Sequence, residues 1–66
     1  MDDRFTFTPY RVKRLRLALK LTQEQFAAKL GCTLFTITRW ESGHTAPRAG
    51  PLVGRLLELE REVKIE

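Results

Sequence analysis

The sequence predicts a compact all-α domain of four helices, and three observations lead to this fold class. Apolar residues recur at helical spacing over about residues 9–20, 23–30, 34–42 and 51–63. Threonine or proline stands where these helices would begin, and glycine stands where two of them would end. A chain of 66 residues with 42% hydrophobic residues also suits one folded domain, residues 1–66, and no more.

The first expected helix follows an N-terminal arm of residues 1–8. Thr8 can cap this helix, and Pro9 suits its first position because the N–H group that proline lacks would have no partner there. Phe7 precedes the cap and can pack on Val12 as a hydrophobic staple. We therefore expect Phe7 to be held against the first turns of this helix.

The apolar stripe of the first helix consists of Val12, Leu15 and Leu19. Leu17 falls outside this stripe, and only a partner surface would explain an exposed leucine at that position. The polar side of the same helix is basic. The sequence therefore leaves one apolar residue of this helix without a role inside the domain.

Two short helices, residues 23–30 and 34–42, are expected to meet through a tight turn. Thr22 and Gln25 have the spacing of a capping box, in which the hydroxyl and the amide each accept a hydrogen bond from a backbone N–H at the helix start. Gly31 can take the left-handed conformation with which many helices end. These signals predict where the first of the two helices starts and stops.

Within residues 22–42, Ala27 and Gly31 match what two steeply crossing helices need. The crossing requires a small side chain, and the corner requires a residue that is free to adopt a positive φ. Thr33 can cap the second of the two helices. This pattern predicts a helix-turn-helix and not a helical hairpin with a long loop.

Several residues of this segment also resemble a known family at matching spacing: Leu21-Thr22-Gln23, Phe26-Ala27, Leu30-Gly31, Ile37 and Trp40-Glu41-x-Gly43. They resemble the lambda-repressor-like, Cro-type (XRE) helix-turn-helix family of DNA-binding regulators, over about residues 12–47. The resemblance implies a lambda-repressor-like four-helix fold and a sequence-specific transcriptional regulator of double-stranded DNA. It also implies that Arg16 forms a structural ion pair with Glu41, and that Gln23 holds a phosphate.

The net charge of +4 is distributed unevenly along the chain. Residues 1–48 hold nine Lys or Arg against four Asp or Glu, whereas residues 49–66 hold three against four. A basic region that contains a groove-reading helix is typical of nucleic-acid binding. A solvated basic surface without a partner would give the same count.

The helix at residues 34–42 has two faces. Ile37 and Trp40 lie on the face expected to be buried. In helix-turn-helix proteins the second helix of the motif enters the major groove. The residues expected to read bases lie on the other face: Leu34, Phe35, Thr38 and Arg39.

The chemistry of these four residues leaves two interpretations open. Arg39 can bond guanine or reach a phosphate instead, and Thr38 can bond either kind of base edge. Leu34 and Phe35 can only touch thymine methyl groups or fill space, so DNA shape would take a larger share of the readout. Alternatively, these two side chains form an apolar patch that binds protein, and the chain is a protein-interaction adaptor.

The expected phosphate contacts surround the helix-turn-helix. Gln23 lies at a helix N-terminus, where the dipole favours anions. Hydroxyl groups, loop N–H groups and one further positive charge come from the other candidates: Thr33, Thr36, Gly43, His44, Thr45 and Arg48.

Other function classes lack support in the sequence. We expect no enzyme, because the sequence has no nucleophile–base–acid set, no phosphate-binding glycine loop and no paired-carboxylate pocket. The acidic residues of the last helix, Glu58, Glu60 and Glu62, are expected on a solvated helix face and not in a catalytic pocket. We expect no cofactor and no metal, because His44 has only Cys32 beside it as a potential ligand. A single cysteine, with no signal peptide and no membrane-spanning run, predicts a cytoplasmic protein.

A chain this short buries only about 60% of its unfolded surface, so a homodimer is expected. The last helix, residues 51–63, carries one apolar stripe of Leu52, Leu56, Leu59 and Val63 and a second beside it. Candidate dimer contacts are Phe5, Leu59 and Val63, although all these side chains could instead cover the core of one subunit. Whether the regulator would be a repressor or an antitoxin with a toxin partner stays open.

Overall fold

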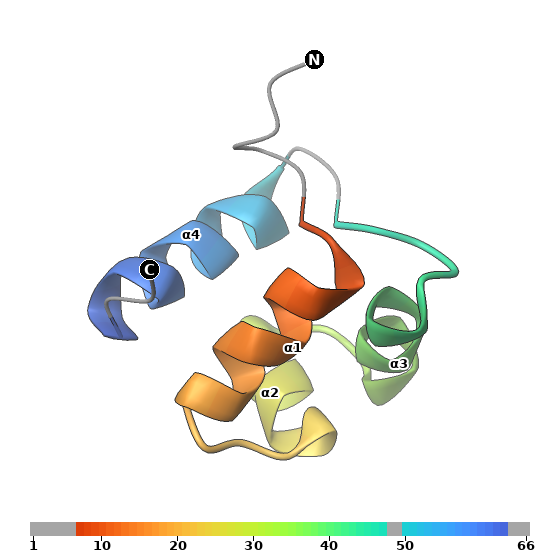
Figure 1. The fold of residues 1–66 in the computed structure, drawn as a ribbon, viewed down its shortest axis with the longest axis horizontal. Helices are drawn as coiled ribbons and strands as arrows, with labels where there is room; N and C mark the ends of the chain where they lie inside the picture. Colours follow the sequence, from red (N-terminus) through yellow and green to blue (C-terminus); the bar gives the residue numbers. More distant parts are fainter. Residues whose placement is uncertain (1–6, 48–49, 64–66) are drawn as a thin grey trace.

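The computed structural model describes residues 7–47 and 50–63, and within these ranges the chain forms four α-helices and no strand. The helices are α1 (Pro9–Ala18), α2 (Gln23–Leu30), α3 (Leu34–Ser42) and α4 (Pro51–Val63). Figure 1 shows α1 in the middle of the molecule, with α4 on one side of it and α3 on the other. The all-α class and all four expected helices are confirmed.

Helix α1 begins as predicted but ends two residues earlier than expected. Thr8 accepts a hydrogen bond from the backbone N–H of Arg11 at 3.1 Å, and Pro9 stands at the first helical position. At the other end, Lys20 has a φ of 60°, in the left-handed region that residues other than glycine rarely adopt. The N–H of Leu21 then donates to the carbonyl of Arg16 at 3.2 Å. This reversal closes α1 and directs the chain into α2.

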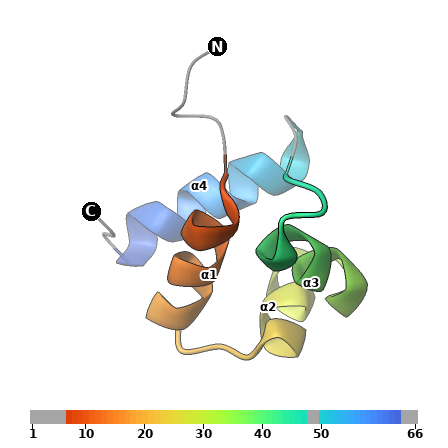
Figure 2. The ribbon, with the colours of Figure 1, turned by 45° about the vertical axis from the view of Figure 1, so that its right-hand side comes forward.

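One hydrophobic core holds the four helices together, and Figure 2 shows that they surround a common centre. Each helix contributes to it, as does Phe7, two positions before α1. Its buried members are Phe7, Val12, Leu15, Phe26, Ala27, Leu30, Ile37, Trp40, Val53, Leu56 and Leu59. Phe7 is only 1% exposed. The residue expected to act as a staple on α1 is therefore a full member of the core.

The structure corrects one of the candidate dimer contacts. Leu59 is 7% exposed and lies in the core of its own chain, so it has little surface left for a second copy. Val63 is half-buried and packs against the same core. Phe5 lies outside the described residues. The apolar stripe of α4 therefore serves mainly to close the domain.

Helix α4 is fixed to α1 by an ion pair that the sequence did not indicate. Arg11 donates from Nε to Oε2 of Glu60 at 2.8 Å and from Nη2 to Oε1 at 2.7 Å. The guanidinium also lies 4.0 Å from the centre of the Phe7 ring. The hydrogen bond to Glu60 raises the pKa of Arg11 above its ordinary value. Glu60 is thus a half-buried partner of α1, and its expected place on a solvated face was wrong.

No helix in the described ranges has the combination of length and apolar character that crossing a bilayer requires.

Two glycines should respond in opposite directions to replacement by alanine. Gly31 ends α2 with a φ of +82°, whereas Gly54 lies inside α4, and an added Cβ would meet nothing within 4 Å at either site. Gly31→Ala should therefore destabilise the fold by about 1–2 kcal/mol through backbone strain alone. Gly54→Ala should stabilise it by about 0.5–1 kcal/mol, because alanine favours the helix.

Urea unfolding followed by circular dichroism measures both free energies of unfolding. Equal shifts of the same sign would show that the left-handed end of α2 is not a constraint on this fold.

Candidate nucleic-acid interface

The turn between α2 and α3 sets the angle at which α3 leaves the core. Gly31 and Cys32 both donate backbone hydrogen bonds to the carbonyl of Ala27, at 2.9 and 3.0 Å. Ala27 itself is 3% exposed, so a larger side chain there would push the neighbouring core side chains aside. Cys32 is half-buried, and desolvation raises the pKa of its thiol. The turn is therefore a closed, hydrogen-bonded corner.

Helix α3 buries one face and presents the other to solvent, as the sequence predicted. Ile37 and Trp40 are 0% and 5% exposed and belong to the core. On the outer face, Leu34 and Phe35 are 42% and 67% exposed. Thr38 and Arg39 beside them are half-buried. The structure therefore brings all four residues expected to read bases onto one exposed surface, which we call the α3 face.

Two of these side chains are already ordered by neighbours on the same helix. The guanidinium of Arg39 lies 5.2 Å from the centre of the Phe35 ring, within the range of a cation–π contact. No carboxylate of the described residues forms an ion pair with Arg39. Thr38 donates its hydroxyl hydrogen to the backbone carbonyl of Phe35 at 2.8 Å. Thr38 therefore has acceptor capacity left for a ligand, and Arg39 has donors left.

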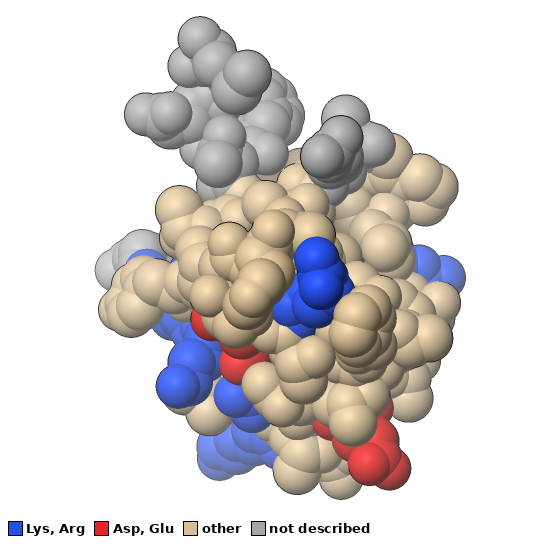
Figure 3. All heavy atoms as spheres, turned by 90° about the vertical axis from the view of Figure 1, so that its right-hand side faces the viewer, with Lys and Arg blue, Asp and Glu red and all other residues tan. Residues whose placement is uncertain are grey.

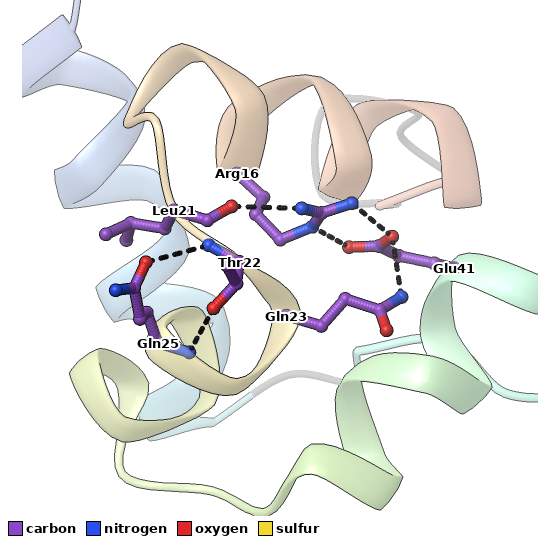
Figure 4. Close-up of polar contacts among 6 residues, drawn as sticks. All are labelled: Arg16, Leu21, Thr22, Gln23, Gln25 and Glu41. Carbon is purple, nitrogen blue, oxygen red and sulfur yellow. Dashed lines mark hydrogen bonds and ion pairs between the residues drawn. The ribbon is translucent and has the colours of Figure 1, made fainter.

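Arg16 and Glu41 form a two-bond ion pair between α1 and α3, at the residues that the family resemblance implies. Nε and Nη2 of Arg16 donate to the two carboxylate oxygens at 2.7 and 3.1 Å. The two side chains are 11% and 6% exposed. Arg16 also donates to the carbonyl of Leu21 at 2.9 Å. Figure 4 shows that one guanidinium connects α1, the segment before α2, and α3.

The same carboxylate also holds Gln23, which the sequence assigned to phosphate binding. The side-chain Nε2 of Gln23 donates to Oε1 of Glu41 at 3.1 Å (Figure 4). Because an amide nitrogen carries two hydrogens, one donor of Gln23 remains available for a ligand. Sequence reasoning missed this contact, because the two residues are 18 positions apart and no local spacing relates them.

The starts of α2 and α3 lie beside each other. Thr22 accepts from the N–H of Gln25 at 3.1 Å, and Gln25 accepts from the N–H of Thr22 at 3.0 Å, which completes the predicted capping box. The first turn of α2, including Glu24, and the first residue of α3, Leu34, line an open groove of about 460 Å³. Two helix N-termini therefore border one groove, which the sequence could not show.

Thr33 and Thr36 combine a capping role with a spare hydroxyl hydrogen. Thr33 accepts from the backbone N–H of Thr36 at 3.2 Å, and the two hydroxyl oxygens are 3.1 Å apart. One hydroxyl must donate to the other, so the second hydrogen of the pair is not used in this contact. The pair can therefore offer one donor next to the start of α3.

The loop after α3 requires a correction. The N–H groups of Gly43, His44 and Thr45 were expected to bind phosphate, but they donate to carbonyls at the end of α3. Those of His44 and Thr45 reach the carbonyl of Arg39 at 3.0 and 3.4 Å, while Gly43 closes the helix with a φ of 86°. Gly43 therefore has no free N–H group for a phosphate. His44 and Thr45 retain exposed side chains, although Nδ1 of His44 already lies 2.8 Å from the hydroxyl of Ser42.

Figure 3 shows the side of the molecule on which α3 lies. Uncharged side chains make up most of this surface, with basic side chains at its centre, at the lower left and at the right edge, and acidic side chains at the lower right and left of centre. Arg48, the last of the expected phosphate contacts, lies outside the described residues.

Comparison with known proteins agrees with this geometry. Residues 12–53, more than half of the chain, match the family model described as helix-turn-helix. The chain belongs to the helix-turn-helix family, in its lambda-repressor-like (XRE) branch. Compared with curated proteins and with solved structures, the chain matches none. Because this helix-turn-helix family consists of DNA-binding regulators, the chain is a DNA-binding regulatory protein in this general sense.

The two arginine–glutamate pairs of this helix-turn-helix protein offer a matched test. Glu41→Ala leaves the largely buried guanidinium of Arg16, which is 11% exposed, without its carboxylate partner. Removal of one member of a fully buried pair costs about 3–5 kcal/mol, and we expect this variant to fall near the lower end of that range. Glu60→Ala should cost clearly less, because Arg11 and Glu60 are 28% and 16% exposed and water reaches both. Free energies of unfolding in urea compare the two variants. Equal losses would mean that the Arg16–Glu41 pair contributes no more to the free energy of unfolding than the Arg11–Glu60 pair does.

Proposed function

We propose that this protein is a sequence-specific regulator of double-stranded DNA that places α3 in the major groove. The observation that carries the proposal is the α3 face: Phe35 is 67% exposed, and Arg39 has no carboxylate partner among the described residues. An unpaired guanidinium on an exposed helix suits bidentate contact with the O6 and N7 atoms of guanine. The basic side chains around this surface would attract the phosphate backbone.

The remaining residues of the α3 face define what kind of base edge it reads. Thr38 donates to its own helix, so it would accept from the amino group of adenine or cytosine. Leu34 and Phe35 carry no polar atom and would contact thymine methyl groups. We therefore expect few direct hydrogen bonds to bases and a large contribution from DNA shape.

Phosphate contacts would come from both ends of the helix-turn-helix. Gln23 offers its second amide hydrogen at the start of α2, where the helix dipole favours an anion. The hydroxyl pair of Thr33 and Thr36 offers a donor at the start of α3. The side chains of His44, Thr45 and Arg48 complete the proposed set.

A homodimer would place two copies of α3 about one DNA turn, roughly 34 Å, apart on a pseudo-palindromic site. Such a regulator would act in the cytoplasm as a repressor or as the antitoxin of a toxin–antitoxin pair. Val63 and Phe5 remain proposed contacts of this dimer.

One observation favours a second candidate function. Leu34 and Phe35 are exposed side by side, and adjacent exposed apolar residues often mark a protein-binding site. On this reading the chain is an adaptor that uses the α3 face to bind protein. The dependence of binding on salt separates the two functions.

Selection of bound sequences from random duplex DNA, followed by fluorescence anisotropy on the best site, tests the proposal. If about four phosphates are neutralised per subunit, log affinity should fall against log salt with a slope of about −3.6. An apolar protein interface would show almost no slope. Failure to enrich any sequence would favour the adaptor.

Arg39→Ala should weaken binding to the selected site by about 1–3 kcal/mol and relax the base preference at one position. Arg61→Ala removes the same charge from an exposed position on α4 and serves as the matched control. Anisotropy titrations on the selected site and on single-base variants of it report both effects. An equal loss on every sequence would make Arg39 a phosphate contact.

A further inference from the structure

Helix α1 carries two large apolar side chains that neither the core nor the α3 face uses. Tyr10 is 72% exposed and Leu17 is 55% exposed. They lie seven positions apart, which is two helical turns or roughly 10 Å along one side of the helix. Val12 and Leu15 occupy the opposite side and are fully buried. Tyr10 and Leu17 therefore point away from the core.

Two basic residues lie between these apolar side chains. Lys13 and Arg14 join Tyr10 and Leu17 around a shallow pocket of about 330 Å³. We call this surface the outer α1 face. The ten residues of α1 include no acidic residue. The ion pairs of the described residues leave this face positive, because they use Arg11 on the side toward α4 and Arg16 on the side toward α3.

We propose that the outer α1 face is a docking site for an acidic, amphipathic helix of another protein. The apolar residues of that helix would pack on Tyr10 and Leu17, and its carboxylates would pair with Lys13 and Arg14. Tyrosine and arginine are enriched among residues that dominate binding energy, and a helix laid on an apolar strip is a common recognition mode. Charge complementarity selects the partner, because a basic helix would be repelled by both cations.

A second copy of this chain fits the outer α1 face poorly. A twofold contact between two such faces would bring Lys13 and Arg14 against the same residues of the other subunit. The outer side of α4 carries Glu58 and Glu62 but also Arg55 and Arg61, and no large apolar residue of α4 is exposed among the described residues. Contacts with the described part of α4 in a second copy would therefore satisfy the charges but leave Tyr10 and Leu17 uncovered.

DNA would make favourable contacts with the two basic residues of the outer α1 face but not with its apolar residues. Phosphates would pair with Lys13 and Arg14 but would gain nothing from covering Leu17, whose exposed surface is aliphatic. The proposal does not depend on the function assigned to α3. The two surfaces belong to different helices, so a partner on α1 leaves the α3 face free.

The test uses the full chain and a fluorescein-labelled peptide of about 20 residues, which is long enough to form a helix. The peptide presents leucines on one side and glutamates on the other, and a control peptide replaces every glutamate by lysine. The acidic peptide should bind and shift the backbone NMR signals of α1, whereas the basic peptide should not bind. Equal binding of both peptides, or signal shifts confined to α3, would overturn the proposal.

Two double variants locate the site. Tyr10→Ser with Leu17→Ser should weaken the acidic peptide at least tenfold, while Leu34→Ser with Phe35→Ser, the matched exposed pair on α3, should leave its affinity unchanged. Both pairs are exposed, so both variants should fold, which circular dichroism verifies. Lys13→Glu with Arg14→Glu should reverse the preference in favour of the basic peptide. A loss of DNA affinity in this last variant, without any effect on the peptide, would assign the face to DNA and refute the proposal.

Discussion

The carboxylate of Glu41 is the point on which the arrangement of the helices depends. It accepts hydrogen bonds from Arg16 on α1 and from Gln23 at the start of α2, and it stands on α3 itself. A buried ion pair adds little net stability compared with an apolar contact of equal size, because desolvation opposes the attraction. Its effect here is directional, since a two-bond pair fixes both distance and orientation. The position of the exposed surface of α3 is therefore determined by a polar contact as well as by the hydrophobic core.

The core and this polar contact each fix one aspect of the position of α3. Ile37 and Trp40 pack the inner face of α3 against the other helices, which sets the distance of α3 from the core. The turn at Gly31 and the ion pair of Glu41 set its direction. A separate pair, Arg11 with Glu60, attaches α4 to the far side of α1. The two sides of α1 are thus linked to different helices through different carboxylates, and its outer side remains open.

The sequence predicted the parts of this structure that short spacings control. The caps at Thr8, Thr22 and Thr33 and the helix ends at Gly31 and Gly43 follow from neighbours within a few residues. Contacts between distant residues could not be predicted this way. Glu60 was expected on a solvated face but pairs with Arg11, and Leu59 was expected at a dimer contact but lies in the core. The loop N–H groups after α3 were misassigned for a different reason, because the carbonyls at a helix end accept hydrogen bonds from the nearest donors before any ligand can use them. The end of α1 was also missed, since a left-handed lysine has no sequence signal. The exposure of Leu17, in contrast, was evident from the helical pattern.

The position of Phe35 relative to Arg39 has a consequence for how a base preference would be encoded. A free arginine side chain loses up to about 2 kcal/mol of conformational entropy when it is immobilised. The ring of Phe35, whose centre lies 5.2 Å from the guanidinium, limits that freedom before any ligand arrives. In the proposed arrangement, contact with the phenyl ring of Phe35 restricts the directions in which the guanidinium of Arg39 can point. A residue without any hydrogen-bonding atom would then help to decide which base pair its neighbour can reach.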